Sequence, residues 1–402
     1  MKKETLSHKN FLVKNYLKKE SLKKSFDKIV NEISQKCDSK KNTYHVLSKK
    51  FVFDFKTNDL KKFKRFSNIA IVGMGGSVLG ANAIYDFLKH KIKKKVIFFD
   101  NLDKEKLNKF KKGNNTKDCL FIIISKSGNT IETISNLIEL NILKSNAKNI
   151  IIITEKKQNI LNLIAKKYNL FFIEHKNFLG GRYSVLSEVG IVPSYLMGVN
   201  VTKLRSNLKK YFEAKERSFL KKSSIALCEI LNKKNYTNLI FLNYAPKLEK
   251  FLFWCQQLIA ESLGKKGKGL LPVISNTPKD HHSLLQLYFD GPKDKIFYIF
   301  SEKETHGKKL KIKKITNKAD FLENKDIDQI KSAQKNALKK VLKKNKIPFR
   351  EFNINYVDEQ TLGEFFSYFI LETAIAGKLA NINPFDQPAV EQVKVFTKKI
   401  LR

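Results

Sequence analysis

Arginine is scarce in this chain. Of the 78 basic residues only six are arginines: Arg65, Arg182, Arg205, Arg217, Arg350 and Arg402. Arginine is the residue favoured for forked contacts to phosphates and bases, so its scarcity counts against a nucleic-acid partner despite a formal net charge of +40. The lysines are spread along the whole chain, a pattern that favours a solvated lysine-rich surface. We therefore expect no nucleic-acid function.

Long apolar runs and paired cysteines are also missing. No stretch of 18 or more uninterrupted apolar residues occurs, so we expect no membrane span. Residues 1–15 are polar and lysine-rich, without the apolar centre of a secretory signal. The cysteines show no C-x-x-C spacing, which favours free thiols in a reducing cytoplasm. They are Cys37, Cys119, Cys228 and Cys255.

The chain has 402 residues and a hydrophobic fraction of 42%, enough for two ordinary domains. Short apolar runs alternate with helical patterns, which predicts an α/β fold with parallel sheets. We expect a helical N-terminal cap (residues 1–50) packed on the first α/β domain (residues 51–200), and a second α/β domain (residues 201–402). The inward stripe of the cap is predicted to comprise Leu12, Tyr16, Leu17, Phe26, Val30 and Ile33.

The predicted strands fall into two groups. Those of the first domain are Ile69–Val72, Val96–Phe99, Leu120–Ile124, Ile150–Ile153 and Leu170–Ile173, and those of the second are Leu239–Leu242, Ile296–Phe300 and Phe349–Ile354. Four helices are predicted in the second domain. They span roughly residues 203–232, the segment that contains Gln257 and Glu261, residues 327–342, and residues 362–374, where apolar residues recur at helical spacing.

Small hydroxyl residues follow one of the buried strands. Leu120–Ile124 ends in Ser125-Lys126-Ser127-Gly128-Asn129-Thr130, after which apolar residues recur at helical spacing. Hydroxyls and backbone N–H groups at a helix N-terminus favour an anion, above all a phosphate. An ordinary strand-to-helix connection capped by Asn129 or Thr130 fits this stretch equally well.

Glycines follow a second strand. Residues 73–77 read Gly-Met-Gly-Gly-Ser, and they precede another helical pattern. The spacing does not fit the dinucleotide fingerprint G-x-G-x-x-G, and Asp100 is a weak match to its acidic residue. Two such loops at the carboxyl ends of two strands suit one phosphorylated small molecule.

Five ordered segments resemble signatures of the glucose-6-phosphate isomerase family, which belongs to the sugar isomerase (SIS) domain superfamily. They are G-M-G-G-S-V-L-G (73–80), S-K-S-G-N-T-I-E-T (125–133), G-G-R-Y-S-V-L-S-E-V-G (180–190), Q-L-I-A-E (257–261) and N-P-F-D-Q-P-A-V-E-Q-V-K (383–394). The resemblance implies two SIS domains with helical extensions at both ends. It also implies reversible conversion of glucose 6-phosphate to fructose 6-phosphate, through ring opening and a cis-enediol(ate).

The resemblance also implies catalytic roles. Glu261 would be the base that moves a proton between C2 and C1, and Arg182 would stabilise the enediolate. His282 would open the sugar ring from the partner subunit of a homodimer with shared sites, and we favour it over the adjacent His281. Lys394 would contact the region of the ring oxygen.

The implied substrate contacts come from four segments. Gln257 shares a helix face with Glu261, and Gln387 would hold the phosphate or sugar on one helical face with Lys394. Asn129 replaces a threonine common in the family and would reshape one phosphate contact. The remaining phosphate and sugar contacts are Ser125, Lys126, Ser127 and Thr130, with Gly76 and Ser77.

No cofactor is expected. No metal is expected either, because the side chains of the adjacent His281 and His282 point apart and the sequence nearby has no third ligand at metal spacing. Two alternatives fit the same segments. One is a related isomerase with other or dual specificity for glucose and mannose 6-phosphates. The other is a non-catalytic sugar-phosphate-binding protein, which would not need Glu261, His282 and Lys394.

Overall fold

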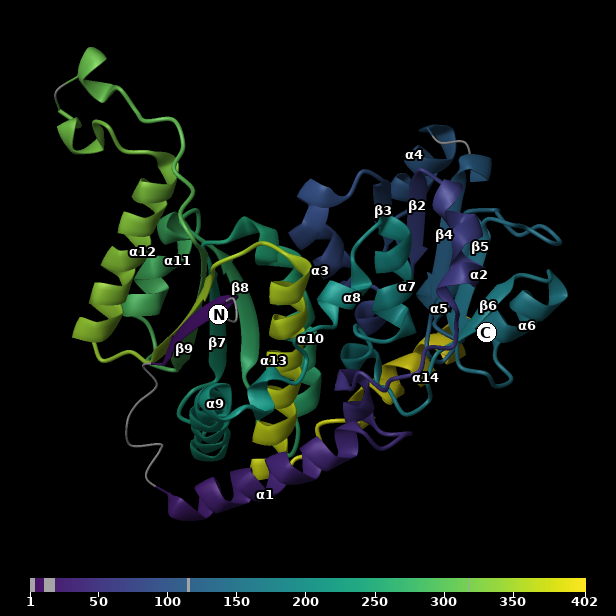
Figure 1. The fold of residues 1–402 in the computed structure, drawn as a ribbon, viewed down its shortest axis with the longest axis horizontal. Coiled ribbons are helices and arrows are strands. Elements are labelled where there is room, and N and C mark those ends of the chain that lie inside the picture. Colours follow the sequence, from purple (N-terminus) through teal and green to yellow (C-terminus); the bar gives the residue numbers. More distant parts are fainter. Residues whose placement is uncertain (1–3, 11–18, 114–115, 317) are drawn as a thin grey trace.

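The computed structural model describes residues 4–10, 19–113, 116–316 and 318–402, and it contains two five-stranded sheets (Figure 1). The first sheet has the order β3-β2-β4-β5-β6, and the second has the order β1-β10-β9-β7-β8. The predicted α/β class is confirmed. The strands are β1 (Leu6–Asn10), β2 (Asn68–Val72), β3 (Lys95–Phe99), β4 (Cys119–Ile124), β5 (Ile150–Thr154), β6 (Phe171–Glu174), β7 (Asn238–Asn243), β8 (Leu271–Asn276), β9 (Lys295–Glu302) and β10 (Phe349–Ile354).

All neighbouring strands of the first sheet are parallel. Every residue of β4 is buried, because this strand lies inside the sheet and both of its faces are covered by helices. Helices α3 (Leu79–Leu88) and α7 (Glu188–Met197) pack on the face toward the second domain. Helices α4 (Lys104–Gly113), α5 (Ile131–Glu139) and α6 (Ile160–Lys167) cover the other face.

The second sheet repeats the strand order of the first. In the first sheet β2 lies between β3 and β4, and β5 follows β4. In the second sheet β7 lies in the same way between β8 and β9, and β10 follows β9. Helices α9 (Ala214–Lys233), α10 (Glu249–Leu263) and α13 (Glu359–Leu379) cover the face toward the first domain. Helices α11 (His281–Phe289) and α12 (Ile327–Lys344) cover the opposite face. The two domains meet along α3 and α10.

The N-terminal segment differs from its prediction. It was expected to be helical and to pack on the first domain, but residues 6–10 form β1, which lies antiparallel to β10 in the second sheet and takes the place of a fifth strand. Helix α1 (Glu20–Cys37) then packs on α13 and α9. Burial of Phe26, Val30 and Ile33 confirms that part of the predicted stripe. The predicted stripe residues Leu12, Tyr16 and Leu17 lie outside the described residues.

In the second domain one strand was not predicted and one helix prediction was wrong. Strand β8 was missed because Pro272 interrupts its short apolar run, and proline is tolerated at the edge position that β8 occupies. The single helix expected over 203–232 is divided into α8 (Val201–Leu204), a 3-10 turn and α9. Ser206 donates its hydroxyl to the carbonyl of Lys203, a local bond that competes with helix continuation.

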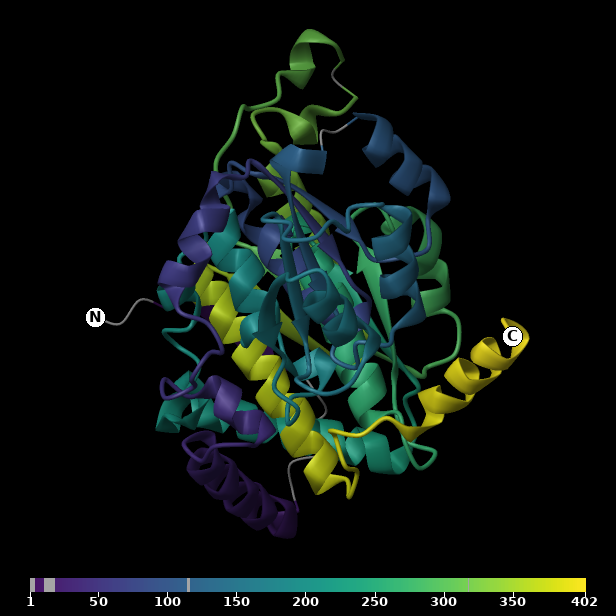
Figure 2. The ribbon, with the colours of Figure 1, turned by 90° about the vertical axis from the view of Figure 1, so that its right-hand side faces the viewer.

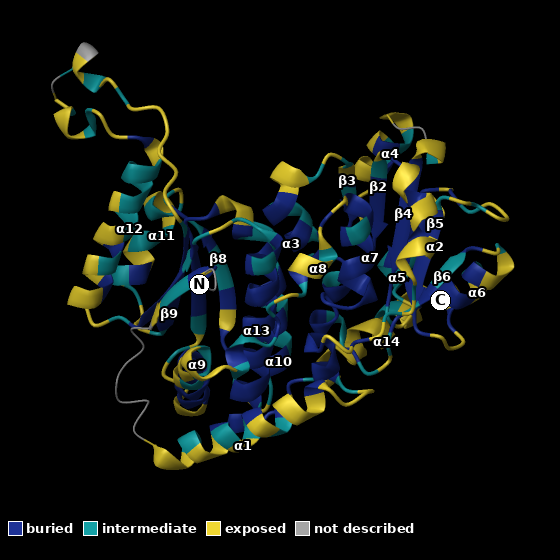
Figure 3. Cartoon of the chain, in the orientation of Figure 1, coloured by how far each residue is buried: buried dark blue, intermediate teal, exposed yellow. Residues whose placement is uncertain are grey.

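Two segments extend from the body of the molecule. The described residues of 303–326 project beyond β9 and α12 (Figure 1), and helix α14 (Glu391–Ile400) projects from the end of the chain (Figure 2). Figure 3 shows that both are largely exposed. The short helix α2 (Thr57–Lys61) precedes β2. Within the described ranges, we find no helix that has both the length and the apolar character to cross a bilayer.

Candidate active site

The glycine-rich loop after β2 joins three parts of the candidate site. Gly75 has φ = +51°, and a side chain there would meet the amide nitrogen of Gln257 at 2.8 Å. A Cβ on Gly76 would lie 2.2 Å from the carbonyl carbon of Gly181, so only glycine permits this close approach of two backbones. Ser77 is buried. The loop therefore brings the Arg182 segment and α10 together. The backbone of Gly181 and Arg182 occupies the space that a side chain on Gly76 would need.

The hydroxyl-rich loop after β4 forms a compact group at the start of α5. The hydroxyls of Ser125 and Thr130 lie 2.8 Å apart, and Ser127 lies 3.5 Å from Thr130. Gly128 has φ = +68°, and its N–H donates to the Ser125 hydroxyl at 3.2 Å. The first N–H groups of a helix lack partners inside the helix. Three hydroxyls beside such N–H groups have the composition of a phosphate site.

The side chain of Lys126 points away from these hydroxyls. Its ammonium donates to the carbonyl of Asn177 at 2.9 Å and lies 3.7 Å from Glu155. Burial lowers the pKa of Lys126, and the charge of Glu155 opposes that shift. The Lys126 carbonyl accepts from the N–H of Glu155 at 3.2 Å and from the hydroxyl of Thr154 at 3.3 Å. Lys126 thus contributes to the loop through its backbone.

Asn129 stabilises the neighbouring helix. Its side-chain oxygen accepts from the N–H of Ile160, the first residue of α6, at 3.0 Å. The N–H of Leu161 donates to the carbonyl of Gly128 at 3.1 Å. The loop therefore binds the free N–H groups at the start of α6. Asn129 was expected from the sequence to reshape a phosphate contact, but in the structure its side chain contacts α6. A ligand would be held at the start of α5.

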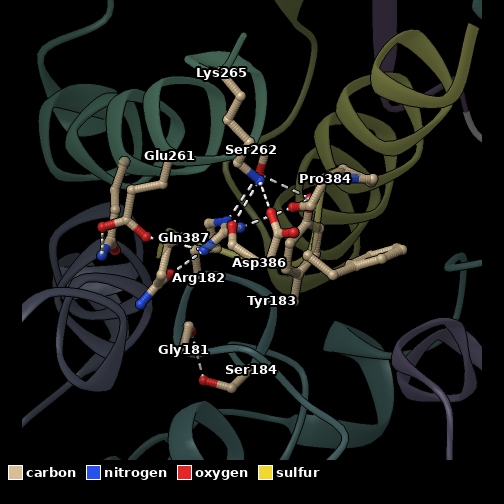
Figure 4. A network of polar contacts seen from close by, with 12 residues as sticks. Gly181, Arg182, Tyr183, Ser184, Glu261, Ser262, Lys265, Pro384, Asp386 and Gln387 are labelled. Atoms are coloured by element: carbon tan, nitrogen blue, oxygen red, sulfur yellow. Dashed lines mark hydrogen bonds and ion pairs between the residues drawn. The ribbon is translucent and has the colours of Figure 1, made fainter. Parts of the chain in front are cut away.

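Arg182 is the most extensively bonded side chain of the site (Figure 4). It is fully buried, and all five of its N–H groups donate to protein acceptors. The acceptors are the Ser262 hydroxyl (2.8 Å), Glu261 Oε2 (3.0 Å), Gln387 Oε1, and the carbonyls of Pro384 (2.8 Å) and Asp386 (2.9 Å). Arg182 therefore joins α10 to the C-terminal segment.

Glu261 is held by two partners. Its Oε2 accepts from Arg182, and its Oε1 accepts from the Gln257 amide at 2.9 Å, one helical turn earlier in α10. The predicted helix face shared by Gln257 and Glu261 is present. The Glu261 side chain remains 28% exposed, and each carboxylate oxygen keeps a lone pair for a proton. An oriented, partly accessible carboxylate next to a guanidinium can act as a base.

The structure places Gln387 in the site but not Lys394. Gln387 contacts Arg182, whereas Lys394 lies on the projecting α14, where it is 57% exposed and pairs with Glu391 at 2.7 Å. The prediction of one shared helical face was wrong. Gln387 precedes Pro388, which disfavours helical backbone at the preceding residue, and α14 begins only at Glu391.

The two adjacent histidines lie away from Glu261. Both are at the start of α11, which follows β8, whereas Glu261 is near the end of α10, which precedes β8. A strand of six residues separates the two ends by roughly 20 Å. His281 Nε2 lies 2.6 Å from the Tyr244 hydroxyl, and burial lowers its pKa. His282 is exposed.

Sequence reasoning missed several residues that build the site. The Tyr183 hydroxyl lies 2.9 Å from the Ser262 hydroxyl and donates to the carbonyl of Pro384 at 3.1 Å. Lys265 contacts Asp386 at 2.6 Å. Adjacency to Arg182, Glu261 and Gln387 in the sequence is the one signal that could have found them. A pocket of about 840 Å³ adjoins Glu261 and Gln387, between the end of α10 and residues 382–390.

The chemistry of the site is that of acid–base catalysis beside a fixed positive charge. A cluster of hydroxyls lies at the start of α5, a carboxylate in α10, and a guanidinium between α10 and the C-terminal segment. Among the residues that the structure describes, we find no group of three or more His, Cys, Asp or Glu side chains placed to hold a metal ion.

Comparisons with known proteins agree with this chemistry. The family model for phosphoglucose isomerase matches residues 21–402. A glucose-6-phosphate isomerase of Methanocaldococcus jannaschii is 31% identical over 360 residues, which cover 87% of this chain and 88% of the relative. A probable glucose-6-phosphate isomerase of Methanococcus maripaludis is 34% identical over 352 residues, which cover 84% of this chain and 79% of the relative.

Solved structures share the fold. A hypothetical protein from Thermus thermophilus superposes with a TM-score of 0.81 at 22% identity, over 98% of this chain and 99% of the other. A glucose-6-phosphate isomerase from Chlamydia trachomatis superposes with a TM-score of 0.76 at 16% identity, over 99% of this chain and 89% of the other. At these identities the likeness concerns the fold alone.

Proposed function

The chain belongs to the phosphoglucose isomerase family, and from that premise we propose that Arg182, Glu261 and Gln387 form its reaction centre. The reaction is the interconversion of glucose 6-phosphate and fructose 6-phosphate, a step of glycolysis. The observation that carries the proposal is the convergence of these three side chains from three distant segments (Figure 4). They lie next to the glycine-rich loop, which contacts Gln257 and Gly181.

Glu261 is the base. An aldose and a ketose differ in which of C1 and C2 bears the carbonyl group. Their interconversion moves one carbon-bound proton from C2 to C1, which a single carboxylate can carry, and one hydroxyl proton from the C2 oxygen to the C1 oxygen. The Gln257 amide and the Arg182 guanidinium fix its orientation, and its partial exposure leaves it accessible to a sugar. This geometry supports a cis-enediol(ate) as the intermediate.

Arg182 acts through its charge. Its N–H groups are already matched to protein acceptors, so it positions Glu261 and Gln387 while its positive charge lies beside the site where the enediolate develops. A guanidinium stays protonated and therefore does not compete for the transferred proton.

The phosphate is bound by Ser125, Ser127 and Thr130 with the backbone of Lys126, at the start of α5. The support is the mutual contact of the hydroxyls and the outward direction of the Lys126 ammonium. Ser77 follows Gly76 at the edge of the glycine-rich loop and lines the sugar.

Ring opening requires His282 of a second copy of the chain. Within one chain the length of β8 separates His282 from Glu261, and His281 is already engaged with Tyr244. A homodimer in which α11 of each subunit completes the site of the other would resolve this separation. His282 is exposed and accessible to a partner.

Lys394 reaches the site when α14 docks over the pocket beside Glu261 and Gln387. Only three residues separate Gln387 from the start of α14. The helix carries exposed apolar side chains, among them Val393 and Phe396, and the pocket is lined in part by Ile382, Pro388 and Ala389. Docking would bury apolar surface on both sides, which is favourable.

We further infer that the enzyme works in the cytoplasm, where reducing conditions suit its four buried, unpaired cysteine thiols.

The test is a coupled assay of the purified protein with fructose 6-phosphate, with and without EDTA and without added nucleotide. We expect conversion to glucose 6-phosphate at a rate that the chelator leaves unchanged. Activity that EDTA abolishes and zinc or manganese restores would contradict the mechanism.

A further inference from the structure

We propose that Lys265, four residues after Glu261, is a positioning residue that holds the C-terminal segment 380–387 against the reaction centre. The inference deepens the proposed function and rests on it, because this segment supplies Gln387 and leads to Lys394. It concerns a lysine loop, residues 264–269 (Gly-Lys-Lys-Gly-Lys-Gly), which follows α10 and which no catalytic role so far explains.

The ammonium of Lys265 has three acceptors, all in the C-terminal segment (Figure 4). They are the carbonyl of Asn383 at 2.5 Å, the carbonyl of Asp386 at 2.6 Å and the carboxylate of Asp386 at 2.6 Å. The side chain is only 12% exposed. The hydrogen bond from Lys265 is the main cause of the lowered pKa of Asp386. An ammonium has three donors, so Lys265 is fully committed to this segment.

The other two lysines of the loop bind just upstream. Lys268 donates to the carbonyl of Ala380 at 2.9 Å, and Lys266 donates to the carbonyl of Asn381 at 3.2 Å. These carbonyls follow the end of α13, where the helix dipole favours cations. The lysine loop therefore holds the end of α13 and the turn that follows it.

The loop itself has a fixed shape. Gly267 and Gly269 have φ values of +65° and +138°, and a side chain on Gly269 would meet the Cα of Gly264 at 2.9 Å. Because this close turn directly follows α10, it fixes the position of Lys265 relative to Glu261.

Arg182 binds the same turn from another side, through the carbonyls of Pro384 and Asp386. Two cations thus converge on residues 383–386, and the next residue is Gln387. A displacement of about 1 Å in a group that positions the reacting atoms can cost on the order of 10²-fold in rate. Lys265 therefore influences turnover without touching the substrate.

The test compares Lys265→Met with a matched control, Lys94→Met. The Lys94 ammonium also donates to two backbone carbonyls, those of Lys64 and Phe66, both at 2.8 Å, but at the amino end of the first sheet. Amide hydrogen exchange of the peptide 380–390 is measured on the full chain, together with kcat and inhibition by inorganic phosphate.

We expect Lys265→Met to speed exchange in this peptide and to lower kcat by roughly 10- to 100-fold, with phosphate inhibition within about twofold. Lys265→Arg should restore most of the turnover, and Lys94→Met should change neither quantity. The double variant Lys265→Met with Lys394→Met should be hardly slower than Lys394→Met alone, because both changes act through one segment.

Unchanged exchange in 380–390 would overturn the inference, and so would faster exchange with unaltered kcat. The exchange measurement does not depend on catalysis. If the unmodified protein lacked isomerase activity, the proposed function would fail, while exchange would still report whether Lys265 holds the segment. Should Lys265→Met fail to fold, Asp386→Asn, which weakens the same contact, gives the same comparison.

Discussion

Arg182 and Glu261 lie 79 residues apart in the sequence, and their side chains meet at 3.0 Å between the two domains. The Arg182 guanidinium is buried, and the negative charge of Glu261 offsets the free-energy cost of removing that guanidinium from water. Removal of one partner from such a buried pair leaves an uncompensated charge, which is costly. A substitution of either residue is therefore expected to affect both the stability of the protein and its activity.

Glu261→Gln should lower kcat by on the order of 10²- to 10⁴-fold, because the amide keeps the shape of the side chain but cannot accept the proton. Inhibition by inorganic phosphate should be retained. Glu249→Gln, at the start of the same helix, is the control and should keep its turnover. Near-native kcat in Glu261→Gln would mean that the base lies elsewhere.

Arg182→Lys should be poorly tolerated although the charge is conserved. An ammonium has three donors, whereas five acceptors surround the guanidinium. We expect a lower melting temperature and a loss of turnover on the order of 10²-fold, measured by calorimetry and by the coupled assay. A variant as stable and active as the parent would show that the network around Arg182 is dispensable.

Changes in the phosphate loop should affect binding. Ser125→Ala and Thr130→Val remove hydroxyls that we propose to contact the phosphate in both the ground state and the transition state. We expect KM to rise about tenfold or more with kcat little changed. Ser145→Ala, at an exposed turn, is the control. A steep fall in kcat at constant KM would assign the loop to another role.

A mixture of two inactive variants tests the shared site. Glu261→Gln subunits and His282→Ala subunits should be inactive alone. If His282 serves the partner, each heterodimer holds one intact site, so random exchange should restore about a quarter of the activity per site. The measurement is the coupled assay after subunit exchange, with heterodimers verified by mass spectrometry.

An inactive mixture that contains heterodimers would place His282 in its own subunit's site or outside the chemistry. His281→Ala is the matched control, because this neighbour contacts Tyr244. We expect His281→Ala to retain most of its activity alone.

Glu188 should make stability depend on pH. Burial raises its pKa from 4.5 to about 7, although its carboxylate accepts from the N–H of Asp54 at 2.9 Å. The folded state therefore binds more protons than the unfolded state between these values. The free energy of unfolding should fall as pH rises from about 4.5 to about 7, by up to roughly 3 kcal/mol from this group.

Glu188→Gln should remove that part of the pH dependence while keeping the acceptor for Asp54. Denaturant unfolding at several pH values measures it, with the exposed Glu105→Gln as the control. Burial lowers the pKa of the nearby Arg205 guanidinium to about 10, which is still well above this range, so Arg205 does not produce this slope. An identical pH profile in Glu188→Gln and the parent would contradict the assignment.

Much of the fold followed from apolar periodicity. Buried parallel strands such as β4 are continuous apolar runs, and every predicted strand is present. The periodicity failed at the two edges of the second sheet. β1 is polar and short, and β8 contains Pro272, because an edge strand needs neither two buried faces nor a full ladder of hydrogen bonds.

The site was predictable where the sequence resembled a family and less so where contacts are long-range. Arg182, Glu261 and Gln387 do come together. Lys265 is one of many lysines, and its nearness to Glu261 in the sequence is its one signal, because its contacts are with carbonyls more than 100 residues away. The position of Lys394 depends on the direction in which α14 continues the chain after Pro388, which neither spacing nor residue type determines.

Strand β1 has a consequence for how the protein is made. Residues 6–10 leave the ribosome early, yet they pair with β10, and Thr5 donates to Glu364 across 359 residues. The second sheet therefore stays incomplete until β10 has been synthesised, and β10 then exposes an unpaired edge until β1 pairs with it. Such non-local pairing is slow, and an open strand edge is prone to join another chain. The early N-terminal segment is the last piece of the second sheet to find its place.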